Sequence, residues 1–502
     1  MGLLSQGIDT LSLGKGRSSR RTSIASTATN STGAARTNSG TDGETQIDDG
    51  DPNDTSTLDQ EEGNILMSLI SQLRPGMDLS KIALPTFVLE PRSLLERITD
   101  FFSHPELIFG VDEEPDAKER FLRVMTFYLS GWHIKPKGVK KPYNPVLGEF
   151  FRCTYVYPDG TEGFYIAEQV SHHPPVSAFF YISPQNGLVV TGELKPKSKF
   201  LGNSAATIME GEDRIRLLNC PEDGEYVITM PNTYARGILF GKMLLELCDL
   251  STIVCSKSDY RADVDFKAKG WISGGYNVIS GKVQGPAKTE VGDLSGHWSS
   301  AIEYTEKKSK EKRVLFDPIQ AHSAPKRCLP ESEQEEYESR RLWSKLTDAI
   351  RAADMHAATA AKSTVEDHQR ELAKKREASG EAAWDQRFFK QVPGDKWMPK
   401  LNIDSLPKDP EEMTVVVRKW IFGDKNPLDY TDIRKSSPVK TFHITSSGLG
   451  AETGAMRGIE TNAVASSGAS TSSMASTASP PASVTAPGPP VGSLSDHPVS
   501  SN

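Results

Sequence analysis

The chain has 502 residues, of which 58 are Lys or Arg and 66 are Asp or Glu, so its formal net charge is −8. No apolar run approaches the roughly 20 residues that span a bilayer. The five cysteines form no CxxC pair, which favours free thiols in a reducing cytosol. Without the nine acidic residues of Asp42–Glu62 the net charge becomes +1, and a near-neutral folded part argues against nucleic acid as a partner.

Polar tails flank the folded part of the chain. Residues 17–62 are nearly all Ser, Thr, Asn, Asp, Gly and Arg, and residues 445–502 are rich in Ser, Ala, Gly and Pro. Such segments have too few apolar side chains to offset the entropy lost on ordering them. We therefore expect disordered tails at residues 1–62 and 441–502, around one domain at about residues 63–440.

The first predicted element is a short amphipathic helix directly after the acidic segment. Its apolar side chains recur with the period of one helix face, namely Ile65, Leu66, Leu69, Ile70 and Leu73. Arg74-Pro75-Gly76 then ends the helix with a turn. An apolar stripe of this kind needs a surface to cover, which could be a core, a membrane or the mouth of a cavity.

Helices at Ser93–Phe102 and Ala117–Tyr128 precede a change of period near Gly148. A series of short strand-like runs follows, at Phe150–Tyr157, Gly163–Gln169, Val176–Ile182, Gly187–Glu193, Tyr226–Met230, Gly237–Leu247, Ala262–Phe266, Gly281–Val283, His297–Tyr304 and Lys312–Phe316. Residues 331–375 return to a helical pattern. So many strands without alternating helices predict a mainly β fold, with a large antiparallel sheet or barrel and helices at both ends.

No enzyme signature accompanies this fold. HExxH and GxSxG are absent, and a phosphate-loop pattern that ends at Lys282 fails because Val283 follows it. No third ligand is obviously placed to make a metal site with a histidine pair. We therefore expect neither enzymatic activity nor a bound metal.

Three polar groups stand out in the remaining sequence: the pair His172–His173, the pair Lys140–Lys141, and the triad Lys362, Glu366 and Arg370. The prolines after the histidines take the chain out of the strand, which could let both imidazoles reach one site. Steps of four place the triad within a helical stripe of about 80°. Each group alone has an ordinary structural explanation. Together they offer cationic donors from three parts of the chain, as a phosphorylated headgroup needs.

The segments around these groups resemble a known family. EQVSHHPP at Glu168–Pro175 looks like the signature of the oxysterol-binding-protein-related (OSBP-related) lipid transfer proteins. Similar segments are KKPYNPVLGE at Lys140–Glu149, PKSKFLGNS at Pro196–Ser204, RGILFGKM at Arg236–Met243, EYESRRLW at Glu336–Trp343 and EDHQRELAKKR at Glu366–Arg376. Ile70–Asp100 is similar to the branch that carries phosphatidylserine, and most similar to the short fungal exchangers of phosphatidylserine and phosphatidylinositol 4-phosphate.

The resemblance implies an incomplete antiparallel β-barrel that encloses a lipid tunnel, with an N-terminal lid at about residues 63–90 and a C-terminal helical segment. It implies exchange of phosphatidylserine for phosphatidylinositol 4-phosphate between the endoplasmic reticulum and the plasma membrane. The protein would be a cytoplasmic monomer, peripheral at membrane contact sites, and its bound lipid would be cargo rather than a cofactor. Anionic membrane surfaces would be transient partners, and a tether protein at the endoplasmic reticulum is a further candidate partner.

The residues that match the family imply two overlapping headgroup sites. Phosphatidylinositol 4-phosphate would bind at Lys141, His172, His173, Lys362, Glu366 and Arg370. Phosphatidylserine would bind at Leu84 in the lid, Lys141, Asn144 and Ser198. Because Lys141 belongs to both sites, the two lipids would compete. Two alternatives stay open: a sterol as the counter-lipid, or a phosphoinositide sensor that moves no lipid.

The acidic segment Asp42–Glu62 is either a solvated linker or an element that repels anionic membranes when it lies near the tunnel mouth. On the second explanation, deleting residues 1–62 removes the repulsion and increases the binding of lipid-loaded protein to phosphatidylserine vesicles. Vesicle flotation measures this binding. Unchanged or weaker binding would leave the linker as the explanation.

Overall fold

The computed structural model describes residues 56–57, 66–79, 84–136, 138–238, 242–269, 275–380 and 384–430. All of them belong to the structural unit Met1–Ser437. The predicted C-terminal tail at 441–502 and nearly all of the predicted N-terminal tail lie outside the described residues. The disorder of these tails and the domain boundaries at 63 and 440 therefore stay predictions.

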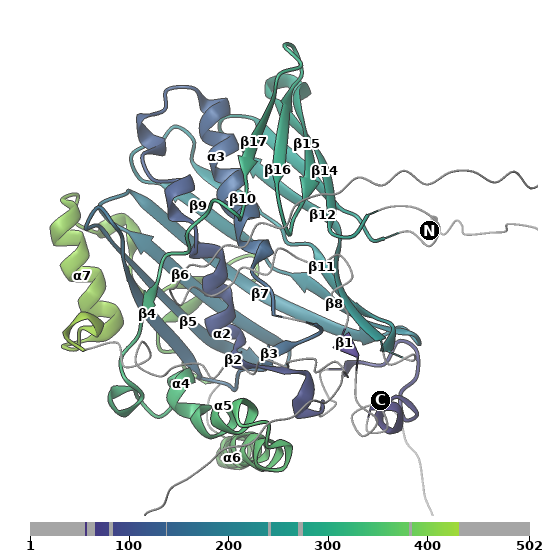
Figure 1. Ribbon diagram of the computed structural model, residues 1–502. Helices are drawn as coiled ribbons and strands as arrows, with labels where there is room; N and C mark the ends of the chain where they lie inside the picture. Colours follow the sequence, from purple (N-terminus) through teal and green to yellow (C-terminus); the bar gives the residue numbers. More distant parts are fainter. Residues whose placement is uncertain are drawn as a thin grey trace, which may run out of the picture. The chain divides into compact units, whose positions relative to one another are not determined.

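One antiparallel sheet of 16 strands makes up most of the described fold (Figure 1). Its strands are β1 (Ser56–Thr57), β4 (Phe150–Val156), β5 (Glu162–His172), β6 (Pro175–Ser183), β7 (Leu188–Phe200), β8 (Ser204–Glu210), β9 (Asp213–Leu217), β10 (Glu225–Ile228), β11 (Asn232–Arg236), β12 (Lys242–Cys255), β13 (Tyr260–Phe266), β14 (Val278–Gly285), β15 (Thr289–His297), β16 (Ile302–Glu306), β17 (Lys312–Phe316) and β18 (Lys326–Arg327). The main path runs β17-β16-β15-β14-β13-β12-β10-β9-β7-β6-β5-β4-β18, and β1, β8 and β11 pair off this path.

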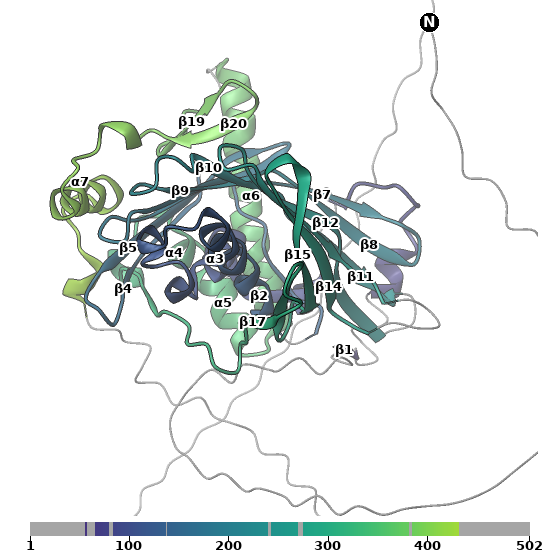
Figure 2. The ribbon, with the colours of Figure 1, turned by 90° about the horizontal axis from the view of Figure 1, so that it is seen from above.

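Both faces of the central strands are covered, which explains their continuous apolar sequences. The helices α2 (Leu94–Arg97) and α3 (Ala117–Ser130) lie on the inner side of the curved sheet. The helix α7 (Pro410–Phe422) and the hairpin β19 (Phe389–Val392) and β20 (Lys396–Pro399) lie on the outer side (Figure 2). Strand β4 is consequently buried along nearly its whole length.

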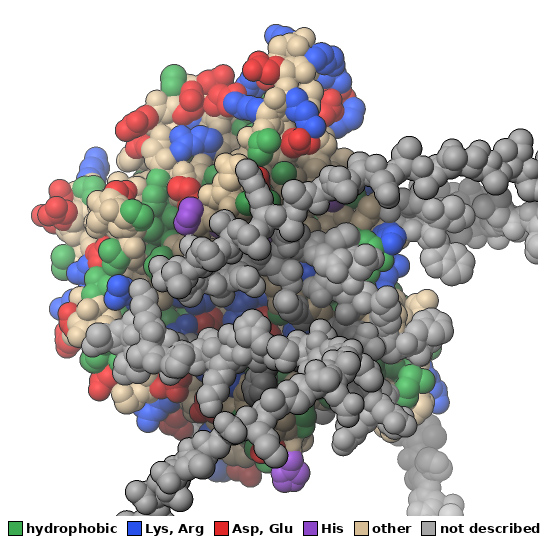
Figure 3. Space-filling view, viewed as in Figure 1, with side chains coloured by type: hydrophobic (Ala, Val, Ile, Leu, Met, Phe, Trp, Pro, Cys, Tyr) green, Lys and Arg blue, Asp and Glu red, His purple; other side chains and the backbone are tan. Residues whose placement is uncertain are grey.

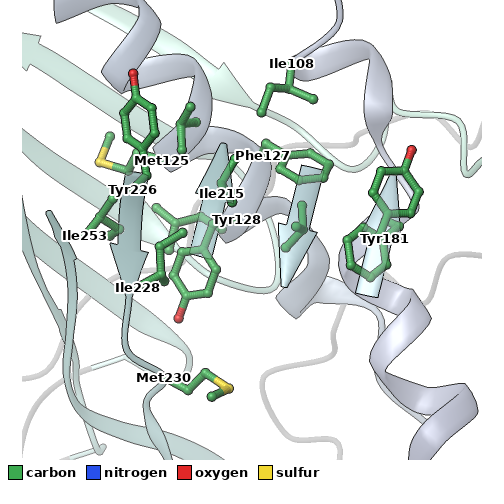
Figure 4. Packing of buried hydrophobic residues seen from close by; sticks show 14 of the residues in the cluster. Ile108, Met125, Phe127, Tyr128, Tyr181, Ile215, Tyr226, Ile228, Met230 and Ile253 are labelled. Atoms are coloured by element: carbon green, nitrogen blue, oxygen red, sulfur yellow. The ribbon is translucent and has the colours of Figure 1, made fainter. Parts of the chain in front are cut away.

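Helix α3 forms the centre of the core. Its N-cap Asp116 accepts a hydrogen bond from the Lys118 backbone N–H, which fixes the start of the helix. Figure 4 shows Tyr128 of α3 close to Ile215 of β9 and Ile228 of β10, and Phe127 of the same helix close to Ile108. Full burial of a side chain of this size contributes about 1.5–3 kcal/mol, so this helix secures the inner face of the sheet.

A second group of elements surrounds the sequence motifs. The short strands β2 (Leu89–Ser93) and β3 (Lys141–Tyr143) pair in parallel. Helices α4 (Ser339–Leu342), α5 (Ser344–Arg351) and α6 (Met355–Ser379) follow the sheet in sequence. Tyr143, Trp343 and Leu346 join these elements in one apolar cluster. No helix in the described ranges has both the length and the apolar character needed to cross a bilayer.

Short 3-10 helices connect many of these elements: η2 (Thr86–Val88), η3 (Ile98–Phe102), η4 (Pro105–Leu107), η5 (Val111–Glu113), η6 (Gly131–His133), η8 (Pro286–Lys288), η9 (Glu331–Glu333), η10 (Ile403–Ser405) and η11 (Pro427–Asp429). One of them corrects a predicted helix. Ser93–Phe102 is not one α-helix, because Ser93 ends β2 and caps α2, and η3 continues from Ile98.

The predicted strand His297–Tyr304 is also wrong. Strand β15 ends at His297, a turn closed by the His297 N–H donating to the Ala301 carbonyl (3.0 Å) follows, and β16 begins at Ile302. The predicted strand Gly237–Leu247 begins too early, since β12 begins at Lys242 and continues to Cys255. Strands β8, β9, β11 and β15 were not predicted at all.

The exposed edge of the sheet carries paired charges. Figure 3 shows acidic and basic side chains interleaved at the top of the view, over β14–β17. Lys282 and Lys307 both pair with Glu290, at 2.6 and 2.8 Å. This face therefore has no uninterrupted basic stripe in its described part.

Glu149 joins three parts of this fold in the interior. Its fully buried carboxylate accepts hydrogen bonds from Ser93 Oγ (2.5 Å), Ser339 Oγ (2.7 Å), Trp343 Nε1 (2.9 Å) and the Val146 N–H (3.1 Å). Burial raises the pKa of Glu149, and these hydrogen bonds oppose the rise. The carboxylate thereby connects β2, β4 and α4–α5.

Removing this carboxylate leaves buried donors without an acceptor. We expect Glu149→Ala to lower the free energy of unfolding by about 3 kcal/mol, measured by urea denaturation. Glu336→Ala, at an exposed glutamate three residues before Ser339, is the matched control and should change it by less than about 0.5 kcal/mol. A wild-type unfolding midpoint for Glu149→Ala would contradict the joining role.

Candidate functional site

His172 and His173 lie side by side where β5 turns into β6. His172 ends β5 and pairs with Pro175, and the His173–Pro174 peptide bond is cis. Ser171 Oγ donates to the Pro174 carbonyl (2.7 Å) and closes the turn. The two imidazole rings meet edge to face with their centroids 4.6 Å apart. The chain thus leaves the strand at the histidines, as the Pro-Pro pattern predicted.

The predicted triad lies on one face of α6. Glu366 pairs with Lys362 at 2.9 Å and with Arg370 at 3.4 Å, and Arg370 also pairs with Asp367. Lys362 is mostly enclosed, with 17% of its side chain exposed, whereas 60% of Arg370 is exposed. The helix therefore presents one enclosed cation and one cation at the solvent.

Glu366 lies close enough to act electrostatically on side chains of all three polar groups. Burial lowers the pKa of the Lys141 ammonium, and Lys362 lowers it further, whereas Glu366 raises it. Burial also lowers the pKa of His172, and His173 lowers it further, while the Pro145 backbone and Glu366 raise it. Because Glu366 acts on both groups and pairs with Lys362, strands β3 and β5 and helix α6 meet at one place.

Lys141, His172, Lys362 and Glu366 form what we call the cationic cluster. Lys141 is exposed to solvent although the surrounding protein lowers the pKa of its ammonium group. The Nδ1 atom of His172 is buried and has no hydrogen-bond partner of normal geometry. A phosphate group at this place would raise the pKa of Lys141 and of His172 and would accept hydrogen bonds from both side chains. No group of three or more potential metal ligands occurs in the described residues.

The residues implied for phosphatidylserine lie in two parts of the structure. Leu84 comes just before η2, and Asn144 directly follows β3 and is exposed. Ser198 lies on β7, where its hydroxyl is 3.1 Å from the Thr207 hydroxyl. Leu84 and Ser198 flank the apolar lid contacts described next, whereas Asn144 belongs to the Lys141 segment.

The lid is closed on the sheet. Residues 66–70 are helical, and Leu66 and Ile70 are buried in an apolar cluster with Phe87 and Phe200. The Gly76 N–H donates to the Phe200 carbonyl (2.6 Å) and the Phe200 N–H to the Met77 carbonyl (3.0 Å). The predicted apolar stripe therefore covers a surface of the protein's own core.

Two further contacts hold the lid to the cationic cluster. Thr86 Oγ1 lies 3.4 Å from Thr359 Oγ1 on α6 and 3.5 Å from the Met355 sulfur. Lys140 Nζ donates to the Phe87 carbonyl. Lys140 therefore has a different role from its neighbour Lys141. The pair Lys140–Lys141 predicts cations at a turn, and only the structure shows that Lys140 holds the lid.

A curved antiparallel sheet with a closed lid and a cationic cluster beside it is the arrangement of a lipid-binding protein. The sequence matches the family model for oxysterol-binding protein over residues 68–349. It is 46% identical over 375 residues to oxysterol-binding protein homolog C23B6.01c of Schizosaccharomyces pombe, covering 72% of this chain and 77% of that protein. The chain belongs to the oxysterol-binding protein family.

Other relatives extend this result. Oxysterol-binding protein homolog 7 of Saccharomyces cerevisiae is 46% identical over 338 residues, covering 66% of this chain and 77% of that protein. Human oxysterol-binding protein-related protein 8 is 41% identical over 397 residues, which cover 78% of this chain and 43% of that protein.

Solved structures share the fold. The Osh1 ORD domain in complex with cholesterol aligns with a TM-score of 0.58 at 23% identity, covering 74% of this chain and 92% of that one. The Osh3 ORD of Saccharomyces cerevisiae in complex with PI(4)P aligns with a TM-score of 0.54 at 20% identity, covering 74% and 96%. The predicted fold class, a mainly β domain with a large incomplete antiparallel barrel and flanking helices, is confirmed.

Lys140 offers a direct test of how the lid is held. Lys140→Met keeps the apolar stem and loses the donor to the Phe87 carbonyl. A charge-assisted hydrogen bond of this kind contributes on the order of 1 kcal/mol, so we expect amide hydrogens in residues 66–79 to exchange about fivefold faster. Hydrogen–deuterium exchange with mass spectrometry measures this rate. Lys345→Met, at an exposed lysine of α5, is the control. Unchanged exchange in Lys140→Met would contradict the role of this contact.

Proposed function

We propose that this protein exchanges phosphatidylserine for phosphatidylinositol 4-phosphate between the endoplasmic reticulum and the plasma membrane. The observation that carries the proposal is the meeting of Lys141, His172 and Lys362 around Glu366, beside a closed lid. These groups come from three elements. The pKa values of Lys141 and His172 are lowered, and a bound anion would raise them. A lipid phosphate is such an anion.

The two headgroups differ in charge. A 4-phosphate has more negative charge and more acceptor oxygens than phosphatidylserine, so it gains more charge-assisted hydrogen bonds from the histidine pair, Lys141, Lys362 and Arg370. Phosphatidylserine uses Lys141 together with Leu84, Asn144 and Ser198. Since Lys141 serves both, one lipid displaces the other. The complex of the Osh3 ORD with PI(4)P supports the first lipid, and the resemblance of Ile70–Asp100 supports the second.

The acyl chains supply the affinity and the lid controls release. Two chains contain about 30 methylene groups, and at about 0.8 kcal/mol each their burial in an apolar tunnel amounts to some 20 kcal/mol before costs. A lipid held in this way does not leave into water unaided. The lid therefore opens at a membrane, where its apolar face finds a second apolar surface.

The cell-level part of the proposal follows from the exchange. The protein acts as a cytoplasmic monomer, peripheral at contact sites, and a tether protein at the endoplasmic reticulum is a candidate partner. It cannot set the direction of transport itself, because exchange only follows gradients. A phosphoinositide gradient between the two membranes sets the direction.

Lipid identification tests the proposal. Protein loaded from liposomes that contain phosphatidylserine, phosphatidylinositol 4-phosphate and a sterol is re-isolated, and its lipid is identified by mass spectrometry. We expect the first two lipids in mutual competition. Sterol in place of phosphatidylserine would overturn the counter-lipid, and binding without transfer between donor and acceptor vesicles would indicate a sensor.

A double substitution separates the two headgroups. His172→Ala with His173→Ala removes hydrogen-bond donors to the 4-phosphate but none of the residues assigned to phosphatidylserine. We expect uptake of phosphatidylinositol 4-phosphate to fall at least about tenfold, with some phosphatidylserine binding retained. His322→Ala, at an exposed histidine, is the control. Normal uptake of both lipids by the double variant would show that the assignment of the pair is wrong.

A further inference from the structure

The segment that leads into β18 connects the two edges of the large sheet. It directly follows β17 in sequence, yet β17 lies at one edge of the sheet and β18 pairs with β4 at the other. Residues 317–325 therefore cross from edge to edge, and Figure 1 shows this segment running from β17 down to β4. The Ala324 N–H donates to the Ser103 carbonyl (2.8 Å), and Lys326 Nζ donates to Thr99 Oγ1 (2.7 Å). We call residues 317–325 the crossing segment.

The register of β18 places two cysteines opposite each other. Lys326 pairs with Tyr155 and Arg327 with Thr154, and continuing this register by one residue beyond β18 sets Cys328 opposite Cys153. Residues directly opposite in such a pair have Cα atoms about 4.5–5.5 Å apart and side chains on the same face. That separation lies within the range of about 4.4–6.8 Å that a disulfide spans. Both cysteines are free, and their thiols are in direct contact.

The two thiols differ in reactivity. The contact with Cys153 lowers the pKa of Cys328, and Arg340 and Lys326 lower it further against burial and Glu96. Burial raises the pKa of Cys153, which has no exposed surface, whereas Cys328 is half-buried. Cys328 is therefore the nucleophilic thiol and Cys153 the resolving thiol.

We propose that Cys153 and Cys328 form a peroxide-sensitive dithiol whose disulfide fastens the crossing segment to β4. The Cys328 thiolate attacks hydrogen peroxide and, with one proton, yields a sulfenic acid and water. The Cys153 thiol then attacks that sulfur, and the hydroxyl leaves with the thiol proton as a second water. One peroxide is reduced, and two thiols are oxidised to one disulfide.

The other cysteines have no such partner across a strand. Cys255 lies opposite Tyr226 and Tyr260, and Cys248 lies opposite Asn232. The pairing of β18 with β4 already holds the backbone next to Cys328 beside the backbone next to Cys153. The structure thus selects one pair among five thiols.

Peptide mapping of the full-length protein tests the proposal. Reduced protein is treated with hydrogen peroxide, alkylated and digested without reduction. We expect one linked peptide pair containing Cys153 and Cys328, a fall from five free thiols to three, and reversal by dithiothreitol. Cys328→Ser should abolish the linkage, and Cys255→Ser should retain it. A linkage between other cysteines, or oxidation of Cys328 without linkage, would overturn the assignment.

Limited proteolysis of the wild-type chain tests whether the disulfide fastens the crossing segment to β4. It needs no substituted variant, so a failure to fold cannot affect the result. Cleavage within residues 317–325 should be several-fold slower in the oxidised protein than in the reduced protein. Equal cleavage rates would show that the disulfide does not fasten the crossing segment. Neither measurement uses a lipid, so both outcomes are independent of the proposed function.

Discussion

The arrangement of the site depends on one buried carboxylate. Glu149 accepts donors from β2, from the β3–β4 segment and from α4–α5, and no water is needed to complete its set of partners. Lys141 lies upstream in the same segment, and α6 follows directly after α5. The hydrogen bonds to Glu149 therefore hold both the segment that carries Lys141 and the helices that lead to the triad on α6. A buried charge is tolerable here because four donors replace its hydration.

In the cationic cluster, unlike at Glu149, the charges are only partly compensated by their neighbours. Lys141 and Lys362 repel each other, and Glu366 neutralises only part of their charge. Like charges that remain close without full compensation destabilise the empty protein slightly, and an anion relieves that cost. Glu149 joins the elements of the fold, whereas the residues around Glu366 are the ones that we propose bind the lipid headgroup.

Local sequence patterns predicted the helix face of the triad and many of the strands. The features that they missed depend on pairing between distant segments. The spacing of Lys362, Glu366 and Arg370 predicted one helix face because helical periodicity is local. Strands β8 and β11 were missed because many of their side chains are only partly buried, and these strands form through pairing with β7 and β12. The convergence of the three polar groups could be predicted only through family resemblance, because it depends on contacts between distant segments. The role of Lys140 left no local signal at all.

Helix α6 touches the lid with its first turns and the cationic cluster with its next ones. Met355 and Thr359 meet Thr86, and Lys362 and Glu366 follow one and two turns later. A helix transmits small displacements along its axis because its backbone hydrogen bonds resist stretching. Because one helix contacts both the lid and the cationic cluster, a ligand that displaced Lys362 would also change the contact of Met355 and Thr359 with Thr86.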